Sequence, residues 1–191
     1  MNRAQLAHLL RSACTVAHDA DVLVLGSQSI LGSFEDDDLP AEATASQEAD
    51  VAFLDDPGMN KADEVEGAIG EMSPFHERFG VYAEGVHLDV ATKPDGWKDR
   101  LVTWDVESSK PAEPRFLDPH DLAVSKLAAG RPKDLDFVLA LIRDGLLNVA
   151  LLRERASMLP AETDPRIGKR IQAWLDFAAG KASQAGPPRS A

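Results

Sequence analysis

The chain has 191 residues, of which 44% are hydrophobic and 27% charged, and these values are typical of one globular domain, or one domain with a small appendage. The formal net charge of −12 excludes the broadly basic surface of a general nucleic-acid binder. Cys14 is the single cysteine and excludes an intrachain disulfide, and no apolar run is long enough to span a bilayer, so we expect a cytoplasmic location.

The N-terminal part of the sequence predicts a helix, a buried strand and a short second helix. Apolar residues recur at helical spacing over residues 2–18, which predicts an amphipathic helix. The apolar run at residues 22–25 predicts a buried strand, which leads directly into the turn Gly26-Ser27. Residues 28–33 are expected to form a short helix immediately after this turn.

The middle of the chain predicts further strands and one hairpin. Glu84-Gly85 separates two short runs of β-forming residues, and such a two-residue link is typical of a β-hairpin. The expected elements of this region are strands at 49–54, 80–83, 86–91 and 100–106, and a helix at 61–71.

From Pro119 onward the sequence is helical. Asp118 suits a helix N-cap, and Pro119 suits the first helical position. Four helical patterns follow, at residues 119–129, 132–144, 147–158 and 165–179. We therefore expect an α/β (α+β) fold, in which a small mixed sheet with flanking helices precedes a helical C-terminal part. The expected boundaries are an α/β domain at 1–118, a helical region at 119–180 and a disordered tail at 181–191.

Charge is unevenly distributed between these two parts. Residues 119–191 carry 11 Lys and Arg against 8 Asp and Glu, which leaves 9 basic and 24 acidic residues for 1–118. This distribution suits a carboxylate-lined metal site that faces a basic surface. Solvated surface charge is the alternative, and it explains most of these residues in either case.

The turn after the first strand is a candidate phosphate site. Gly26 has no Cβ, so a ligand can approach the backbone closely. Ser27 and Ser29 place hydroxyl and backbone N–H groups at the start of the expected short helix, where they favour an anion. Many α/β proteins, however, end a strand in Gly-Ser for reasons of turn geometry alone.

Three carboxylates form a candidate metal site. Glu48 and Asp50 are two residues apart on an expected strand, so both project from the same face. Asp89 lies within a second apolar strand, where a carboxylate is costly to bury without a cation. Mg²⁺ is the usual hard cation that would relieve the repulsion among such groups. The same acid-x-acid spacing also occurs at Glu64/Glu66 and Asp134/Asp136, so the spacing alone does not indicate a metal site. It does so here because the pair follows a strand and a glycine turn, and another strand acid lies downstream.

These motifs occur in the order of a known family. Gly26-Ser27 at a strand end, Glu48-Ala49-Asp50 on the next strand and Asp89 on a later one resemble the nucleotidyltransferase superfamily. Within this superfamily, the chain resembles the branch of bacterial abortive-infection and toxin nucleotidyltransferases, the AbiEii-like group, which includes the DUF6036 domain family. That branch also carries a helical lysine followed by a basic and acidic stretch, which Lys126 and residues 131–136 resemble. The resemblance covers roughly residues 20–145.

The resemblance implies a nucleotide site. Gly26, Ser27 and Ser29 would bind the nucleotide phosphates, Lys126 would contact the triphosphate, and Asp134 would orient that lysine or complete the site. The residues themselves also allow simpler roles, since Lys126 could be a solvated helix lysine. Asp134 is equally a good acid for the first turn of a helix.

The resemblance also implies a metal site. Glu48 and Asp50 would be metal ligands, and Asp89 would be a metal ligand or the base that positions the acceptor hydroxyl. This chain departs from the family pattern in two ways: Glu48 stands where Asp is commoner, and 21 positions separate Ser27 from Glu48.

The implied activity is Mg²⁺-dependent transfer of a nucleotidyl group from an NTP to an acceptor hydroxyl, with one or two Mg²⁺ ions. The acceptor would be RNA, including the tRNA 3′ end, or a protein, in a toxin–antitoxin or phage-defence setting with a possible cognate antitoxin. One alternative is a catalytically degenerate member that acts as a binding or antitoxin-like partner. Another is a metal-dependent phosphohydrolase on a different α/β scaffold.

Overall fold

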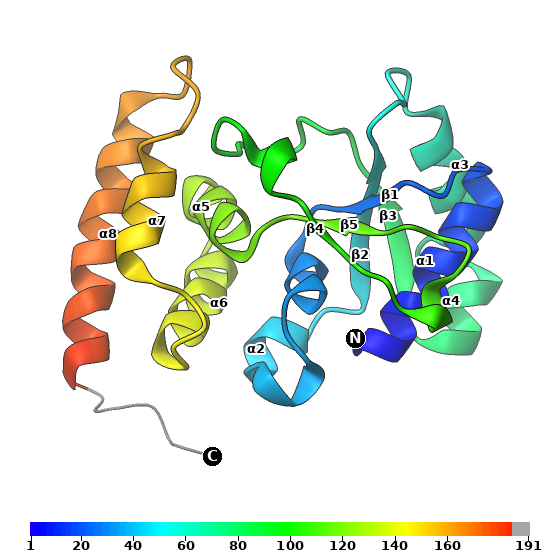
Figure 1. Ribbon diagram of the computed structural model, residues 1–191, viewed down its shortest axis with the longest axis horizontal. Helices are drawn as coiled ribbons and strands as arrows, with labels where there is room; N and C mark the ends of the chain where they lie inside the picture. The colour runs from blue at the N-terminus through cyan, green and yellow to red at the C-terminus, as the bar shows by residue number, and fades with distance from the viewer. Residues whose placement is uncertain (185–191) are drawn as a thin grey trace. The chain divides into compact units, whose positions relative to one another are not determined.

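The computed structural model describes residues 1–184 of the chain (Figure 1). Its first part is built on a five-stranded mixed sheet. Contacts between Cα atoms divide the chain into two units. The first comprises Met1–Val90 and Arg100–Asp118. The second comprises Ala91–Asp99 and the described part of the chain from Pro119 onward. None of the described helices is long and apolar enough to cross a membrane.

The sheet belongs to the first unit, and its strand order is β3-β2-β1-β5-β4. Its strands are β1 (Val22–Val24), β2 (Glu48–Phe53), β3 (Tyr82–Gly85), β4 (Val102–Thr103) and β5 (Arg115–Phe116). β1 pairs with β2 antiparallel and with β5 parallel, whereas β2 pairs with β3 parallel and β4 with β5 antiparallel. The expected α+β fold with a small mixed sheet and C-terminal helices is confirmed.

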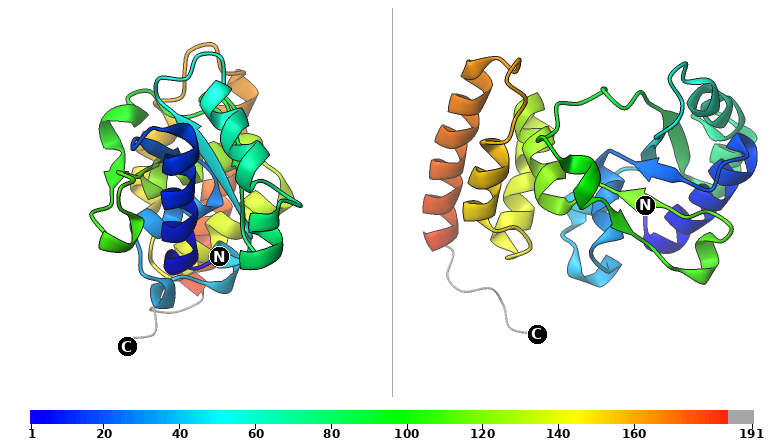
Figure 2. Two further views of the ribbon diagram at one scale, coloured as in Figure 1. Left: turned by 90° about the vertical axis from the view of Figure 1, so that its right-hand side faces the viewer. Right: turned by 45° about the horizontal axis from the view of Figure 1, so that its top comes forward.

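Two helices of the first unit, α1 (Arg3–Ala17) and α3 (Asn60–Ile69), pack on the sheet through their buried apolar faces. Asn2 and Gln5 form a capping box that starts α1, and Leu6, Leu9 and Leu10 on its inner face are fully buried. Figure 2 (left) shows α1 and α3 side by side against the sheet, and the two helices contact one another. The α-helices of this unit are α1 (Arg3–Ala17), α2 (Ala41–Thr44), α3 (Asn60–Ile69) and α4 (Pro74–Phe79).

Short 3₁₀ segments complete the connections. They are η1 (Ser27–Gly32), η2 (Asp36–Asp38), η3 (Trp97–Arg100) and η4 (Glu107–Ser109). The first of these, η1, follows β1 directly and contacts β2 and β5. The core beneath it contains the fully buried side chains of Ile30, Leu31 and Phe116. A short helix after the glycine turn is therefore present, in the tighter 3₁₀ form.

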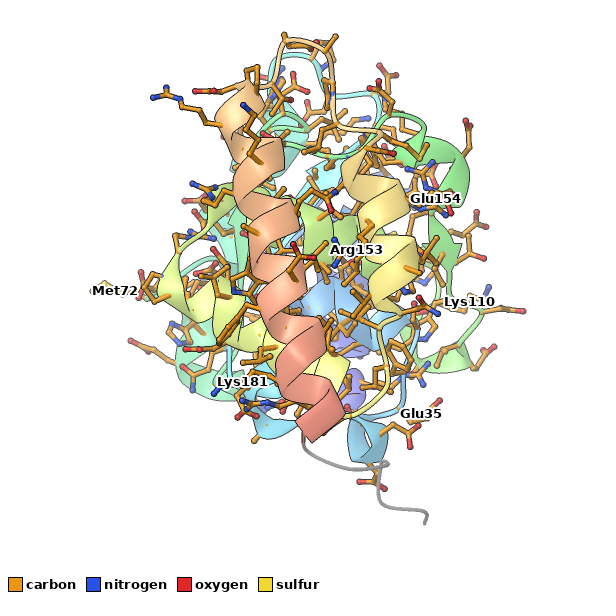
Figure 3. The ribbon with its side chains drawn as sticks, turned by 90° about the vertical axis from the view of Figure 1, so that its left-hand side faces the viewer. Glu35, Met72, Lys110, Arg153, Glu154 and Lys181 are labelled. Carbon is orange, nitrogen blue, oxygen red and sulfur yellow. The ribbon has the colours of Figure 1, made fainter. Side chains whose placement is uncertain are left out.

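The second unit is helical. Its helices are α5 (Pro119–Ala129), α6 (Pro132–Arg143), α7 (Val149–Ala156) and α8 (Pro165–Gln184). Gly130 and Gly145 have φ of 68° and 75° and follow the ends of α5 and α6, where a left-handed residue closes a helix. The guanidinium of Arg153 on α7 donates to Gln172 and Asp176 of α8, at 2.9 and 2.6 Å, and Figure 3 shows Arg153 between the two helices.

Two features of the second unit were not expected from the sequence. Residues 91–99 belong to it, and the Asp95 N–H donates to the Met158 carbonyl over 2.6 Å. Helix α8 continues to Gln184, so the first residues of the expected disordered tail are helical. The rest of that tail lies outside the described residues.

The expected hairpin is wrong. Residues 82–85 form one strand, β3, which runs parallel to β2, and the Val86 N–H still donates to the Val51 carbonyl over 2.9 Å. The chain therefore continues along β2 where the sequence predicts a turn. Residues 86–91 form no strand: the Val90 N–H donates to the His87 carbonyl, which closes a turn, and Val90 is 58% exposed.

Three smaller differences concern short elements, for which local sequence is least decisive. The strand expected at 100–106 is only Val102–Thr103, and its partner strand β5 was not predicted. Helix α4 was also missed, although Ser73 caps it and Pro74 occupies its first turn. The helices expected at 2–18, 61–71, 119–129, 132–144, 147–158 and 165–179 are all present, within a few residues at their ends.

Candidate functional site

Three acids meet on one face of the sheet, where β2 pairs with the edge strand β3. Glu48, Asp50 and Glu84 can each place one carboxylate oxygen so that these oxygens all lie within 4.8 Å of one another. Asp50 and Glu84 are direct neighbours in the parallel register. Between Glu48 and Asp50, Ala49 points to the opposite face and is fully buried. The alternation along β2 thus separates a core face from a carboxylate face.

Gly26 makes room for one of these carboxylates. A Cβ placed on Gly26 would lie 1.4 Å from Oδ2 of Asp50, a separation that no side chain could tolerate. The Leu25 N–H donates to the Asp50 carbonyl over 3.0 Å, so the end of β1 is fixed against β2 at this point. Glycine is therefore needed here because the Asp50 carboxylate lies directly against the turn.

The surroundings of the cluster raise the pKa of Glu84. Burial, followed by the charges of Glu48 and Asp50, raises the pKa of Glu84 to about 7. Glu66 of α3 adds to this effect, and its carboxylate also accepts a hydrogen bond from the Gly85 N–H over 3.1 Å. The ionised forms of the cluster therefore repel one another at neutral pH.

Tyr82 donates a hydrogen bond to the side chain of Glu48. It is opposite Glu48 in the register of β2 and β3, and its phenol donates to Oε2 of Glu48 over 3.2 Å. Burial, followed by the charge and hydrogen bond of Glu48, raises the pKa of Tyr82 to about 12. The phenol therefore remains a neutral donor at physiological pH.

The donor set fits a hard divalent cation. Carboxylate oxygens are the ligands that Mg²⁺ and Mn²⁺ prefer, and thiolate and imidazole ligands play no part in this cluster. A cation bound among Glu48, Asp50 and Glu84 would also offset the repulsion that raises the pKa of Glu84. Grouped acids are common on protein surfaces, so the grouping alone does not identify a cation site. The glycine that makes room for Asp50 is the additional observation that supports one here.

Ser29 does not present its hydroxyl to this cluster. Its side chain is fully buried, and its Oγ donates to the Val24 carbonyl over 3.0 Å, with the Leu117 carbonyl at 3.4 Å. The hydroxyl thus connects β1 with the chain that follows β5. Ser27, by contrast, begins η1 immediately after Gly26 and is partly exposed.

Asp89 is not brought to the three acids. It lies in the turn after β3, its N–H donates to Nδ1 of His87 over 3.1 Å, and its side chain is 90% exposed. Glu84 is the third acid of the cluster, and it was missed because Glu84-Gly85 was interpreted as a hairpin turn. The alternation of Tyr82, Ala83 and Glu84, with only Ala83 buried, could have identified β3 as a strand continuing through residue 84.

Lys126 and Asp134 pair within the second unit. Nζ of Lys126 lies 3.3 Å from Oδ1 of Asp134 and 4.5 Å from the ring centroid of Phe137, and both side chains of the pair are buried. Nε of Arg131 lies 2.6 Å from the other carboxylate oxygen. Burial alone would raise the pKa of Asp134, but the hydrogen bond from Arg131 and the charge of Lys126 lower it below its usual value.

Comparison with known proteins yields one informative result. A family model described as a nucleotidyltransferase of unknown function (DUF6036) matches residues 4–178. Neither the curated proteins nor the solved structures include a significant match to the chain. The match includes the three clustered acids, Gly26 and the pair Lys126–Asp134.

Proposed function

The chain belongs to the DUF6036 family of nucleotidyltransferases, and we propose that it transfers a nucleotidyl group from an NTP to an acceptor hydroxyl at the carboxylate cluster of β2 and β3. The observation that carries the proposal is the convergence of Glu48, Asp50 and Glu84 beside Gly26. The fold and the family membership agree with this proposal.

In the proposed reaction, the acceptor oxygen forms a bond to the α-phosphorus of the NTP. The bond between that phosphorus and the bridging oxygen of the β-phosphate breaks, and pyrophosphate leaves. The acceptor hydroxyl loses its proton to a base. Such transfers depend mainly on positioning and on stabilisation of the phosphate charge.

We assign the cation of this reaction to Glu48, Asp50 and Glu84, with Mg²⁺ as the ion. When bound, Mg²⁺ would neutralise phosphate charge and promote ionisation of the acceptor hydroxyl. The three carboxylates would hold it, and Gly26 would leave the room that the Asp50 carboxylate occupies. Glu84 takes the position that the sequence assigned to Asp89, which the turn after β3 leaves exposed.

The phosphates of the NTP are assigned to the turn at the end of β1. Gly26 and Ser27 are proposed to face the phosphates, because they border the carboxylate cluster at the end of β1. A phosphate role for the hydroxyl of Ser29 would require it to leave its carbonyl partners. The assignment of Lys126 to the triphosphate, and of Asp134 to its orientation, remains a prediction from the family resemblance.

The acceptor and the biological setting are further proposals. RNA, including the tRNA 3′ end, is the first acceptor to test, and a protein hydroxyl is the second. A toxin–antitoxin or phage-defence role, with a cognate antitoxin, follows from the resemblance to AbiEii-like proteins alone. A cytoplasmic location follows from the single buried cysteine and the sequence composition.

Calorimetric titration tests the site directly. Mg²⁺ and each NTP are titrated into the wild-type protein, Asp50→Ala and the control Glu64→Ala, which removes an exposed acid from α3. We expect Mg²⁺-dependent NTP binding by the wild type and by Glu64→Ala, and loss of this binding in Asp50→Ala. Positive binding would be followed by an acceptor screen with labelled NTP.

Two outcomes would contradict the proposal. If the folded wild type bound neither Mg²⁺ nor any NTP, a catalytically degenerate protein that binds a partner would be the better explanation. If NTP were hydrolysed without any acceptor, a phosphohydrolase would be favoured.

A further inference from the structure

Tyr82 is rigidly held beside the carboxylate cluster. It is the single tyrosine of the chain, and its phenol donates to Oε2 of Glu48 over 3.2 Å. Its ring lies 4.7 Å, centroid to centroid, from the ring of His76 on α4. Nδ1 of His76 in turn accepts a hydrogen bond from the Met72 N–H over 3.1 Å, which fixes the imidazole. The phenol is thus oriented by its strand and by α4 together.

Glu48 needs such a partner more than an aspartate would. A glutamate side chain has one more rotatable bond than aspartate, so its carboxylate samples more positions and loses more conformational entropy when it is fixed. A hydrogen bond to one carboxylate oxygen removes part of that freedom before any ligand binds. It also occupies one lone pair of Oε2, which favours binding of a cation through the other oxygen, Oε1.

We propose that Tyr82 is a positioning residue that holds Glu48 in a one-oxygen binding mode and thereby makes the site select Mg²⁺ over Ca²⁺. This inference rests on the proposed function, because it requires a cation at Glu48, Asp50 and Glu84. Partners of metal-binding side chains commonly control affinity in this way, and removing one typically costs 10–100-fold in affinity.

Selectivity follows from the different coordination of the two ions. Mg²⁺ is small and demands near-octahedral geometry, so it favours carboxylates that each supply one oxygen. Ca²⁺ is larger and accepts six to eight oxygens, including both oxygens of one carboxylate. Freeing Oε2 of Glu48 would therefore harm Mg²⁺ binding and leave Ca²⁺ binding unchanged or stronger.

The test compares the two ions in the wild type and in Tyr82→Phe, which removes the hydroxyl and keeps the ring beside His76. Mg²⁺ and Ca²⁺ affinities are measured by calorimetry on the full chain. We expect the Mg²⁺ affinity to fall about 10-fold or more in Tyr82→Phe, with little change for Ca²⁺. The control Thr103→Val removes a hydroxyl from the opposite edge strand, β4, and should change neither affinity.

A spectroscopic signal separates positioning from a merely structural role. Because Tyr82 is the single tyrosine, 3-fluorotyrosine labelling yields one ¹⁹F resonance that reports this phenol alone. We expect Mg²⁺ to shift this resonance in the wild type and to leave it unshifted in Asp50→Ala. Thermal unfolding of Tyr82→Phe checks that the variant is folded when its affinities are measured.

Each result decides the proposal. If the wild type binds Mg²⁺ and Tyr82→Phe keeps the same preference for Mg²⁺ over Ca²⁺, the proposed role of Tyr82 is overturned and the metal site stands. A resonance that Mg²⁺ does not shift would overturn it as well. A wild type that binds no Mg²⁺ would overturn both this inference and the proposed function.

Discussion

The protein contains two groups of charged side chains with opposite electrostatics: one groups like charges, and the other pairs an acid with basic side chains. In the first unit, three acids face one another, and burial and the neighbouring charges raise the pKa of Glu84 to about 7. In the second unit, one buried acid, Asp134, is bound by Lys126 and Arg131, and its pKa is lowered. The first arrangement gains by binding a cation, whereas the second is already neutralised by the protein itself.

The contrast separates a candidate ligand site from a structural ion pair. Paired, buried charges usually contribute to fold integrity, because removing one partner leaves the other charge buried and unpaired. Grouped like charges reduce stability in the absence of a ligand, and they are tolerated where the site has a function. We therefore expect substitutions in the two groups to have opposite effects on stability, as the following predictions specify.

The largest effect is expected for Asp134→Ala. This change removes the buried carboxylate that both Lys126 and Arg131 contact, and losses of about 3–5 kcal/mol are typical when one partner of a buried pair is removed. The free energy of unfolding, measured by urea denaturation, should fall accordingly. The control Asp136→Ala removes an exposed acid from the same helix and should stay within about 0.5 kcal/mol of the wild type. Equal effects in both variants would show that the Lys126–Asp134 pair is not structural.

Gly26→Ala should abolish tight cation binding by displacing the carboxylate of Asp50. Its Cβ would lie 1.4 Å from the present position of Oδ2, so Asp50 must move. We expect Mg²⁺ affinity to fall about 100-fold, which corresponds to about 2.7 kcal/mol. Calorimetry measures the affinity, and circular dichroism confirms the fold.

Gly67→Ala provides the matched control for this substitution. A Cβ at Gly67 meets no atom within 4 Å, and the residue lies within helix α3. Alanine should stabilise this helix by about 0.5–1 kcal/mol and leave Mg²⁺ binding unchanged. If Gly26→Ala bound Mg²⁺ as well as Gly67→Ala does, the contact between Gly26 and Asp50 would have no role in the site.

Glu84→Gln and Asp89→Asn distinguish the two candidates for the third acid. The cluster geometry predicts that Glu84→Gln lowers Mg²⁺ affinity about 10-fold or more, because one anionic ligand is lost. Asp89→Asn changes an exposed turn residue and should leave the affinity unchanged. Titration of both variants with Mg²⁺ measures the difference. The reverse result would return Asp89 to the metal site and remove Glu84 from it.

The smallest effect concerns the pH dependence of stability in metal-free buffer. Because the pKa of Glu84 rises from an ordinary 4.5 to about 7 on folding, the native state binds more protons than the unfolded state between these pH values. The contribution of Glu84 to the free energy of unfolding is therefore greatest below pH 4.5 and is lost as the pH rises towards 7.

Glu84→Gln isolates this contribution, since glutamine stays neutral at every pH. Neighbouring groups partly desolvate the Glu84 carboxylate, but the residue as a whole is exposed. Solvent therefore screens the repulsion, and we expect a stability gain of only about 1 kcal/mol at pH 8. The gain relative to the wild type should vanish below about pH 4.5 and shrink with added salt. Urea denaturation across the pH range measures it. A difference that does not change with pH would mean that Glu84 titrates normally.

Periodic apolar patterns in the sequence determined the long elements of this protein. The helix expected at 2–18 and the four helices after Asp118 are present, and α1 and α6 show most clearly an apolar face that repeats at helical spacing. The run at residues 22–25, the Gly26 turn and the acid-x-acid pair on β2 were also found, since a strand ended by glycine and a strand with alternating acids are local patterns.

Only the tertiary structure decided which acid joins Glu48 and Asp50. The choice depends on β3 running parallel to β2, which places Glu84 opposite Asp50 and Tyr82 opposite Glu48. A strand of four residues carries too little periodicity to reveal its partner or its direction, and Glu84-Gly85 has the composition of a turn. Pairing between strands that are distant in sequence, and not local propensity, placed Glu84 in the cluster and left Asp89 outside it.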